Sequence, residues 1–259
     1  MTSPEKAAQK IFGERAAHYA TSATHTDAEI LARVVELARP FPTARCLDVA
    51  TGAGHTALAL APRCAAVVAT DLTREMLREA RTLAGDRGIR NVFLHQADVH
   101  RLPYRSGSFD IVTSRRAPHH FSNIDAALAE MRRVLAPEGR LVLDDRSVPE
   151  DDFVDATMNE LDRLHDESHV RQYRPSEWRA MLEKAGFVID SLEPYTKHRP
   201  LTSLTEGVSP ANVRRIEEIL AGMSEPQRSA FRFEKVKGEL HLTHWYVMIA
   251  ARPPASSPR

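Results

Sequence analysis

A short segment with two glycines is the part of the sequence best suited to ligand binding. It reads CLDVATGAGHTA (46–57), begins within a strand-like run at residues 45–49 and leads into a helical pattern. Glycine lets the backbone turn sharply and approach a ligand, and the N-terminus of the following helix adds partial positive charge. The spacing Gly52-x-Gly54-x-x-Ala57, with Asp71 19 residues after Gly52, fits the fingerprint of dinucleotide-binding proteins. Taken alone, this segment is therefore compatible with a nicotinamide dinucleotide as the ligand.

Three acidic residues at the ends of three strand-like runs narrow the choice of ligand. Asp48 lies directly beneath the glycine turn, where a carboxylate would repel a pyrophosphate but attract an ammonium group. Asp71 has the position of a ribose-binding acid, and Asp98 is placed to accept from an adenine amino group. Open parallel sheets bind ligands at the carboxyl ends of their strands, so the three acids indicate a site for a cationic nucleoside.

Short apolar runs alternate with helical patterns up to residue 145, which is typical of a parallel sheet covered by helices on both faces. The expected strands are residues 45–49, 65–70, 92–95, 109–114 and 139–143, and the helices between them 55–60, 75–83 and 124–135. Residues 5–37 are expected to be helical. Later in the chain we expect helices at 150–168 and 175–184, strands at 187–192 and 239–251, and irregular and helical chain at 196–238.

Five motifs make the sequence resemble the class I S-adenosylmethionine-dependent methyltransferases. The resemblance is strongest to the "type 11" small-molecule group, which includes ubiquinone/menaquinone-biosynthesis C-methyltransferases, and it covers about residues 12–146. The motifs are LDVATGAGH (47–55), ATDLTREML (69–77), QADVHRLPY (96–104), SFDIVTSR (108–115) and RVLAPEGRLVLD (133–144). The resemblance implies S-adenosyl-L-methionine as cofactor, S-adenosyl-L-homocysteine as product, and methyl transfer to C, N or O of a small-molecule metabolite.

The same resemblance implies a role for individual residues in holding the cofactor. Many members have glycine where this chain has Ala50. The segment AHY at 17–19, with Tyr19, resembles one that folds over the cofactor as a lid. The implied contacts are Asp48, Ala50, Gly52, Ala53 and Gly54 for the methionine moiety, Asp71 for the ribose, Leu72, Met76, Asp98 and Val99 for the adenine, and Ser114 and Arg115 after the fourth strand.

Two adjacent histidines are the candidates for acid–base chemistry. His119 and His120 follow the fourth strand, and Asp145 ends the fifth, where it could orient a histidine as a general base. A base helps methyl transfer only when the acceptor is a hydroxyl, an ammonium or a carbon acid. Packing of one histidine against Phe121 with the other in solvent is the alternative interpretation of this pair.

The expected fold is an α/β Rossmann-like methyltransferase fold: a doubly wound, mostly parallel seven-stranded sheet with an antiparallel last strand and a helical cap. The boundaries follow the change of pattern along the chain. They are an N-terminal helical lid (1–40), a cofactor-binding α/β core (41–146), a cap or substrate region with late core elements (147–238), a terminal strand (239–252) and a disordered tail (253–259).

Composition excludes several other classes of protein. The chain has 259 residues with 35 basic and 35 acidic side chains, and this balance argues against a nucleic-acid binder. No apolar run is long enough to span a membrane, and the charged N-terminus is unlike a secretory signal. Cys46 and Cys64 are expected to be buried reduced thiols, as in a cytoplasmic protein. His165 and His169 have the i, i+4 spacing of half a metal site, but too few further ligands accompany them, so no metal is expected.

Two other functions stay open at this point. One is an NAD-dependent oxidoreductase, favoured by the glycine spacing and Asp71 but opposed by Asp48 and Asp98. The other is a protein that binds S-adenosylmethionine without methylating anything, because a cofactor site and its chemistry are separable. A monomer and a homodimer are both compatible with the sequence.

Overall fold

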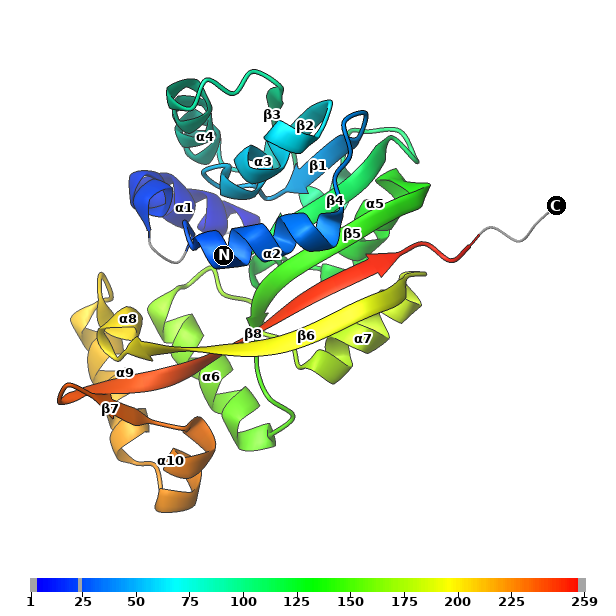
Figure 1. The fold of residues 1–259 in the computed structure, drawn as a ribbon. Helices are drawn as coiled ribbons and strands as arrows, with labels where there is room; N and C mark the ends of the chain where they lie inside the picture. Colours follow the sequence, from blue (N-terminus) through cyan, green and yellow to red (C-terminus); the bar gives the residue numbers. More distant parts are fainter. Residues whose placement is uncertain (1–3, 23–24, 256–259) are drawn as a thin grey trace.

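A mixed, mainly parallel β-sheet forms the centre of the computed structural model, which describes residues 4–22 and 25–255 (Figure 1). The strands lie in the order β3-β2-β1-β4-β5-β8-β6, and a short β7 pairs with β8 off this path. β8 runs antiparallel to its neighbours β5, β6 and β7. The strands are β1 Arg45–Val49, β2 Ala66–Asp71, β3 Val92–Gln96, β4 Phe109–Arg115, β5 Leu135–Ser147, β6 Val188–Pro200, β7 Glu234–Val236 and β8 Glu239–Arg252. The predicted fold class is confirmed, with β7 as a strand that the sequence did not predict.

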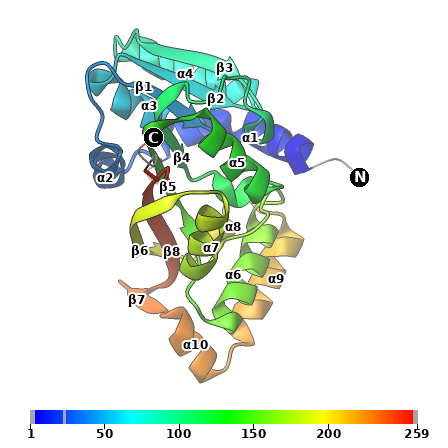
Figure 2. The same cartoon turned by 90° about the vertical axis from the view of Figure 1, so that its right-hand side faces the viewer.

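Helices cover both faces of this sheet (Figure 2). Several begin at side chains that accept a hydrogen bond from a backbone N–H of the first turn: Asp27 before α2, Asn123 before α5 and Asp151 before α6. None of the described helices is long and apolar enough to cross a membrane. The helices are α1 Pro4–Thr21, α2 Ala28–Ala38, α3 His55–Leu60, α4 Arg74–Asp86, α5 Ile124–Val134, α6 Asp152–His165, α7 Pro175–Lys184, α8 Thr202–Thr205, α9 Pro210–Ala221 and α10 Glu225–Phe231.

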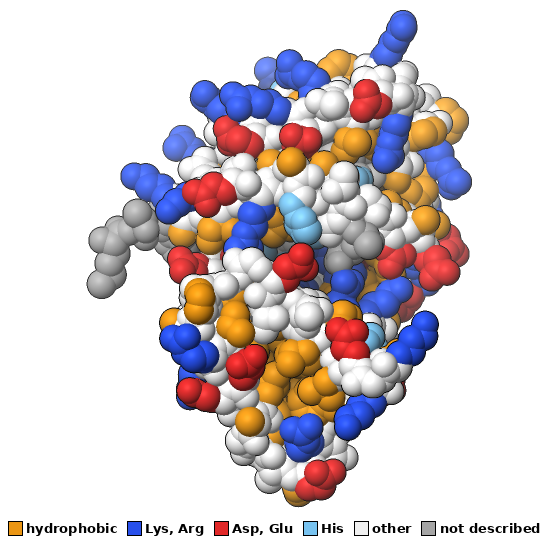
Figure 3. Space-filling view, turned by 90° about the vertical axis from the view of Figure 1, so that its left-hand side faces the viewer, with side chains coloured by type: hydrophobic (Ala, Val, Ile, Leu, Met, Phe, Trp, Pro, Cys, Tyr) orange, Lys and Arg blue, Asp and Glu red, His pale blue; other side chains and the backbone are white. Residues whose placement is uncertain are grey.

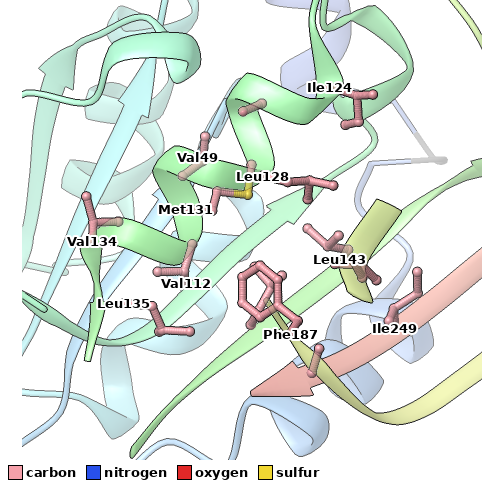
Figure 4. Close-up of a cluster of buried hydrophobic side chains, with 14 of the residues drawn as sticks. Val49, Val112, Ile124, Leu128, Met131, Val134, Leu135, Leu143, Phe187 and Ile249 are labelled. Atoms are coloured by element: carbon pink, nitrogen blue, oxygen red, sulfur yellow. The ribbon is translucent and has the colours of Figure 1, made fainter. Parts of the chain in front are cut away.

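Successive side chains of the central strands pack into two different cores, because strand residues alternate between the faces of a sheet. Ile111 of β4 lies in the core formed with α2 and α3, whereas its neighbour Val112 lies in the core formed with α5 and α7. Figure 4 shows this second core, where Leu128 and Met131 of α5 lie near Leu143 of β5. Both faces are therefore apolar, as expected for a sheet with helices on each side.

The two cysteines lie in the first of these cores. Cys46 and Cys64 are free and buried, and their sulfur atoms are 2.9 Å apart. This placement agrees with the prediction of buried reduced thiols.

The C-terminal part of the chain forms a third core beyond the edge of the parallel strands. Helices α6, α8, α9 and α10 pack there with the first half of β8, which contributes Leu242 and Trp245. The region 147–238 therefore contains the four helices of this third core together with α7 and β6, which complete the layers of the sheet.

Figure 3 shows one face of the molecule, with acidic and basic side chains interspersed over it and hydrophobic side chains gathered in the lower part.

Several element bounds differ from those predicted. β6 continues to Pro200 because its second half pairs with β8 along the edge of the sheet, where proline is tolerated. The helix expected at 150–168 ends at His165, so His169 lies outside it. Residues 5–37 form two helices, α1 and α2. Of the expected disordered tail, 253–255 follow β8 without regular structure, and 256–259 lie outside the described residues.

The glycine segment between β1 and α3 adopts the left-handed backbone conformation that its sequence suggests. Gly54, the residue before α3, has φ +86°, and a Cβ atom built on it would lie 2.9 Å from the Cβ atom of Ala80 in α4. Glycine at this position therefore permits both the turn and the close approach of α3 to α4.

We expect Gly54→Ala to lower the free energy of unfolding by about 2–4 kcal/mol, from left-handed strain together with the clash against α4. Gly88→Ala is the matched control, because Gly88 has φ +65° with no heavy atom within 4 Å of its added Cβ, and it should cost only about 1–2 kcal/mol. Denaturant unfolding measures both. Ala80→Gly should reduce the cost of Gly54→Ala by about 1 kcal/mol, and equal costs without this coupling would contradict the packing argument.

Candidate active site

A cavity lies at the carboxyl ends of the parallel strands and is covered by α1; we call it the first cavity. The ends of β1, β2 and β4 and the segment after β3 all contribute to its wall. The predicted cofactor residues that border it are Tyr19, Asp48, Ala50, Gly52, Ala53, Asp71, Leu72, Met76, Asp98, Val99 and Arg115. The structure therefore brings together most of the residues that the sequence assigned to the cofactor.

Two of the predicted cofactor residues do not border this cavity. Gly54 serves the turn and the α3–α4 contact described above. Ser114 is buried within β4, and its hydroxyl has no hydrogen-bond partner among the described residues. The strand position of Ser114 places it inside the sheet layer, so sequence adjacency to Arg115 did not indicate exposure to the site.

Other residues border the first cavity without having been singled out from the sequence. Some of them had a detectable signal: Glu5, Ala8 and Phe12 recur at helical spacing with Tyr19 and so share one face of α1. The other lining residues reach the cavity through packing between segments far apart in the sequence, which local patterns do not indicate. The additional lining residues are Glu5, Ala8, Phe12, His25, Val49, Thr51, His55, Thr56, Thr73, Ala97, His100, Arg116, Ala117, Phe121 and Ser122.

Asp48 borders the first cavity but also holds the loop above it. Its carboxylate accepts hydrogen bonds from the hydroxyls of Thr113, at 2.6 Å, and Thr51, at 2.5 Å. Burial raises the pKa of Asp48, while these hydroxyls act in the opposite direction. Asp48 therefore links β1, β4 and the glycine loop in one hydrogen-bonded group.

Asp71 ties the glycine loop to the end of β2. One carboxylate oxygen accepts from the backbone N–H of Gly52 and the other from the N–H of Thr73, each at 2.8 Å. Burial raises the pKa of Asp71 to about 6, against the effect of these two donors. Because each oxygen can accept a second hydrogen bond, the carboxylate keeps acceptor capacity toward the cavity.

Asp98 is the most exposed of the three acids, with 43% of its side chain accessible. Its Oδ1 atom accepts from the backbone N–H of His100 at 2.9 Å and lies 2.7 Å from the Nδ1 atom of the same residue. The second carboxylate oxygen has no hydrogen-bond partner among the described residues, so it is available to a donor in the cavity.

One wall of the first cavity is formed by residues of α1 together with His25. The side-chain amide of Gln9 donates to the carbonyl of Leu72 at 2.9 Å. Tyr19 lies against Phe12 and His25 in edge-to-face contacts, and burial raises the pKa of Tyr19 to about 12. Tyr19 is thus a neutral phenol at neutral pH.

The residues of the first cavity fit a cationic nucleoside with an amino-acid tail. The three strand-end acids Asp48, Asp71 and Asp98 border the cavity. Leu72, Met76 and Val99 supply apolar contacts for a base. The Nη1 atom of Arg115 is buried at the cavity without a partner among the described residues, and a carboxylate would satisfy it.

A second, larger cavity of about 700 Å³ adjoins the first, and its size is in the range of small-molecule sites. It lies between α1, the ends of β4 and β5, α6 and the middle of β8. The residues common to both cavities are Phe12, Tyr19, His25, Arg116 and His120. Those of the second cavity alone are Arg15, His18, Thr21, Ser22, His119, Arg146, Asp162, His165, Asp166, His169, Arg199, Ser203, Glu206, Gly207, His244 and Tyr246.

The predicted pair of His119 and Asp145 is assembled in the structure. The Nδ1 atom of His119 lies 2.6 Å from Oδ1 of Asp145, and the backbone N–H of His119 donates to Oδ2 at 2.8 Å. Burial lowers the pKa of His119 well below its usual value of 6.5 and raises that of Asp145 to about 7. The imidazole is therefore neutral at neutral pH.

His120 lies beside His119, with ring centroids 4.0 Å apart, and borders both cavities. His119 borders only the second one. The alternative placed one histidine on Phe121 and the other in solvent. In the structure the ring of His120 instead contacts those of Phe12, His119 and His169.

The other predicted histidine pair does not form a chelate. The Nδ1 atom of His165 contacts the carbonyl of Leu204 at 3.1 Å, and the Nε2 atom of His169 contacts Oδ1 of Asn159 at 3.0 Å. Within 4–22 and 25–255, no group of three or more His, Cys, Asp or Glu side chains could hold a metal ion.

Comparison with known proteins agrees with the geometry of the site. Residues 47–143 match the family described as "Methyltransferase domain". The chain is 40% identical over 170 residues to the uncharacterized methyltransferase YcgJ of Bacillus subtilis, covering 66% of this chain and 67% of that protein. The crystal structure of YcgJ superposes with a TM-score of 0.81 at 32% identity, covering 86% of this chain and 97% of that one.

Relatives with named substrates are similar over shorter or more divergent stretches. A malonyl-[acyl-carrier protein] O-methyltransferase of Geobacter sulfurreducens is 34% identical over 217 residues, covering 76% of this chain and 74% of that protein. A demethylmenaquinone methyltransferase of Thermus thermophilus is 44% identical over 113 residues, covering 43% of this chain and 51% of that protein. The chain therefore belongs to the class I methyltransferases, a family of enzymes for which S-adenosylmethionine is the methyl donor.

Proposed function

We propose that this methyltransferase binds S-adenosylmethionine in the first cavity and a small-molecule acceptor in the second. The observation that carries the proposal is the common boundary of the two cavities, because five side chains border both. Ligands on its two sides would be close enough to react, and methyl transfer requires the acceptor atom to lie about 3 Å from the methyl carbon.

The acids and backbone donors of the first cavity would hold the cofactor. Asp71 would accept from the ribose hydroxyls, Asp98 from the adenine amino group, and Arg115 would donate to the carboxylate of the methionine moiety. Asp48 would place negative charge near the ammonium group while keeping the loop in position. When bound, the sulfonium supplies an electrophilic methyl group, and the protein mainly positions the acceptor for in-line attack.

The histidine pair at the boundary would assist acceptors that carry a proton. A neutral imidazole can take this proton, and Asp145 fixes the orientation of His119 from behind. A polar metabolite suits the second cavity, because basic, acidic and histidine side chains make up most of its wall.

Asp71→Ala should weaken binding of S-adenosylmethionine by about 10–100-fold, because it removes an acceptor for the ribose and the support of two loop amides. Titration calorimetry with S-adenosylmethionine, S-adenosylhomocysteine and NAD measures this. Asp86→Ala, at the exposed end of α4, is the control and should bind as the unmodified protein does. NAD binding tighter than either sulfur nucleoside would instead favour an oxidoreductase.

His119→Ala, His120→Ala and Asp145→Asn should leave the affinity for S-adenosylmethionine nearly unchanged and lower turnover. Loss of a general base typically lowers the rate by about 10²–10⁴-fold. Replacing its orienting carboxylate by an amide can cost as much, because the amide favours the wrong tautomer of the imidazole. The acceptor is first identified as the metabolite in an extract that gains a methyl group from labelled cofactor. Normal turnover in both histidine variants would show that neither acts as a base, and transfer to no metabolite would favour a protein that binds without methylating.

A further inference from the structure

A hydrogen-bonded group behind His120 is not used by the function described so far. It consists of Asp166 and Ser168, in the segment between α6 and α7. The Ser168 hydroxyl donates to Oδ1 of Asp166 at 2.6 Å, and the backbone N–H of Ser168 donates to the same oxygen at 2.9 Å. The Nδ1 atom of His120 lies 3.1 Å from both the carbonyl oxygen and the hydroxyl oxygen of Ser168.

This arrangement determines which ring nitrogen of His120 carries the hydrogen. The carbonyl oxygen of Ser168 can only accept, and the single hydroxyl hydrogen of Ser168 is committed to Asp166. Burial alone would raise the pKa of Asp166, but the two hydrogen bonds from Ser168 favour its charged form and act against this rise, so Asp166 is an ionised acceptor at neutral pH. Nδ1 of His120 must therefore donate, and its Nε2 atom carries the lone pair.

The position of the ring makes this lone pair relevant to the reaction. Ser168 holds the Nδ1 edge, and no described residue forms a hydrogen bond with Nε2. Phe12 of α1 and His119 confine the ring, with centroids 4.9 Å and 4.0 Å away. His120 borders both cavities, whereas His119, whose Nδ1 atom contacts Asp145, borders only the second.

We propose, on the basis of the methyl transfer proposed above, that His120 is the catalytic base of this enzyme and that Ser168 and Asp166 are positioning residues that hold it in the Nδ1–H form. The acceptor class follows: the methylated atom bears a hydrogen, as in a hydroxyl, an N–H group or a carbon acid. A thioether or a tertiary amine, which has no such hydrogen, is excluded.

The proposed step balances in atoms and electrons. The acceptor atom forms a bond to the methyl carbon while the sulfur–methyl bond breaks, and the electron pair of that bond stays on sulfur. The hydrogen of the acceptor atom moves as a proton to Nε2 of His120. Nδ1–H keeps its hydrogen bonds to Ser168, and the imidazolium then releases its added proton to water.

The tautomer can be measured without cofactor or acceptor, by ¹⁵N NMR of histidine-labelled protein at neutral pH. We expect His120 to carry its hydrogen on Nδ1. Asp166→Ala frees the Ser168 hydroxyl hydrogen to turn toward Nδ1, so part of the population should shift to the Nε2–H form and turnover should fall about tenfold. Asp166→Asn retains an acceptor oxygen and should keep the Nδ1–H form.

The double variant Asp166→Ala/Ser168→Ala is the decisive comparison. It removes the freed hydroxyl but leaves the backbone carbonyl, so the Nδ1–H form should return and turnover should recover in part. A residue that only stabilises the fold would give the opposite order, because the double variant loses more contacts. Ser191→Ala, in β6, should change neither the tautomer nor turnover, and thermal unfolding checks that each variant is folded.

Three results would overturn the proposal. The first is a hydrogen on Nε2 of His120 in the unmodified protein, and the second is the same tautomer in Asp166→Ala and the double variant. The third is an acceptor that gains about 15 mass units and a permanent positive charge, instead of the gain of about 14 expected when a hydrogen is replaced. Failure to bind S-adenosylmethionine in calorimetry would contradict the proposed function itself, and it is read independently of the NMR result.

Discussion

The hydrogen bonds between the Asp71 carboxylate and the backbone N–H groups of Gly52 and Thr73 are the interaction on which the site depends. They join the loop after β1 to the turn after β2, two segments that lie beyond the paired residues of these strands. A buried carboxylate is costly unless donors surround it, and two amides here offset much of that cost. The same group therefore shapes the wall of the first cavity and supplies acceptor oxygens to its interior.

The sheet provides the framework for this interaction. Asp48 and Asp71 lie at the carboxyl ends of adjacent parallel strands, with Asp98 just after a third, so their side chains reach one edge without any special loop structure. Two apolar cores fix the strands from opposite faces, and the close contact of Gly54 with Ala80 sets the separation of α3 and α4. Rigid elements of this kind are needed to hold a ligand in a reactive geometry.

Local sequence patterns predicted the strands and turns that line the first cavity. They failed where contacts between segments far apart in the sequence determine the structure. The strand ends, the glycine turn and the pairing of His119 with Asp145 follow from residue types and chain order. The continuation of β6 through Pro194 to Pro200 does not, because pairing with β8 overrides its weak strand pattern. Ser168 and Asp166 likewise reach His120 only through the packing of the segment after α6, and no local periodicity reports such a contact.

Helix α1 contributes residues to both cavities, among them Phe12 and Tyr19. Its polar tethers to the core include the bond from Gln9 to Leu72 and the contact between Glu5 and Ser122. Because one helix lines both cavities, a substitution that displaces α1 would change the walls of both at once. Loops and helices that cover a site often set the rate of ligand exchange, so such a substitution would alter the exchange of either ligand as well as its affinity.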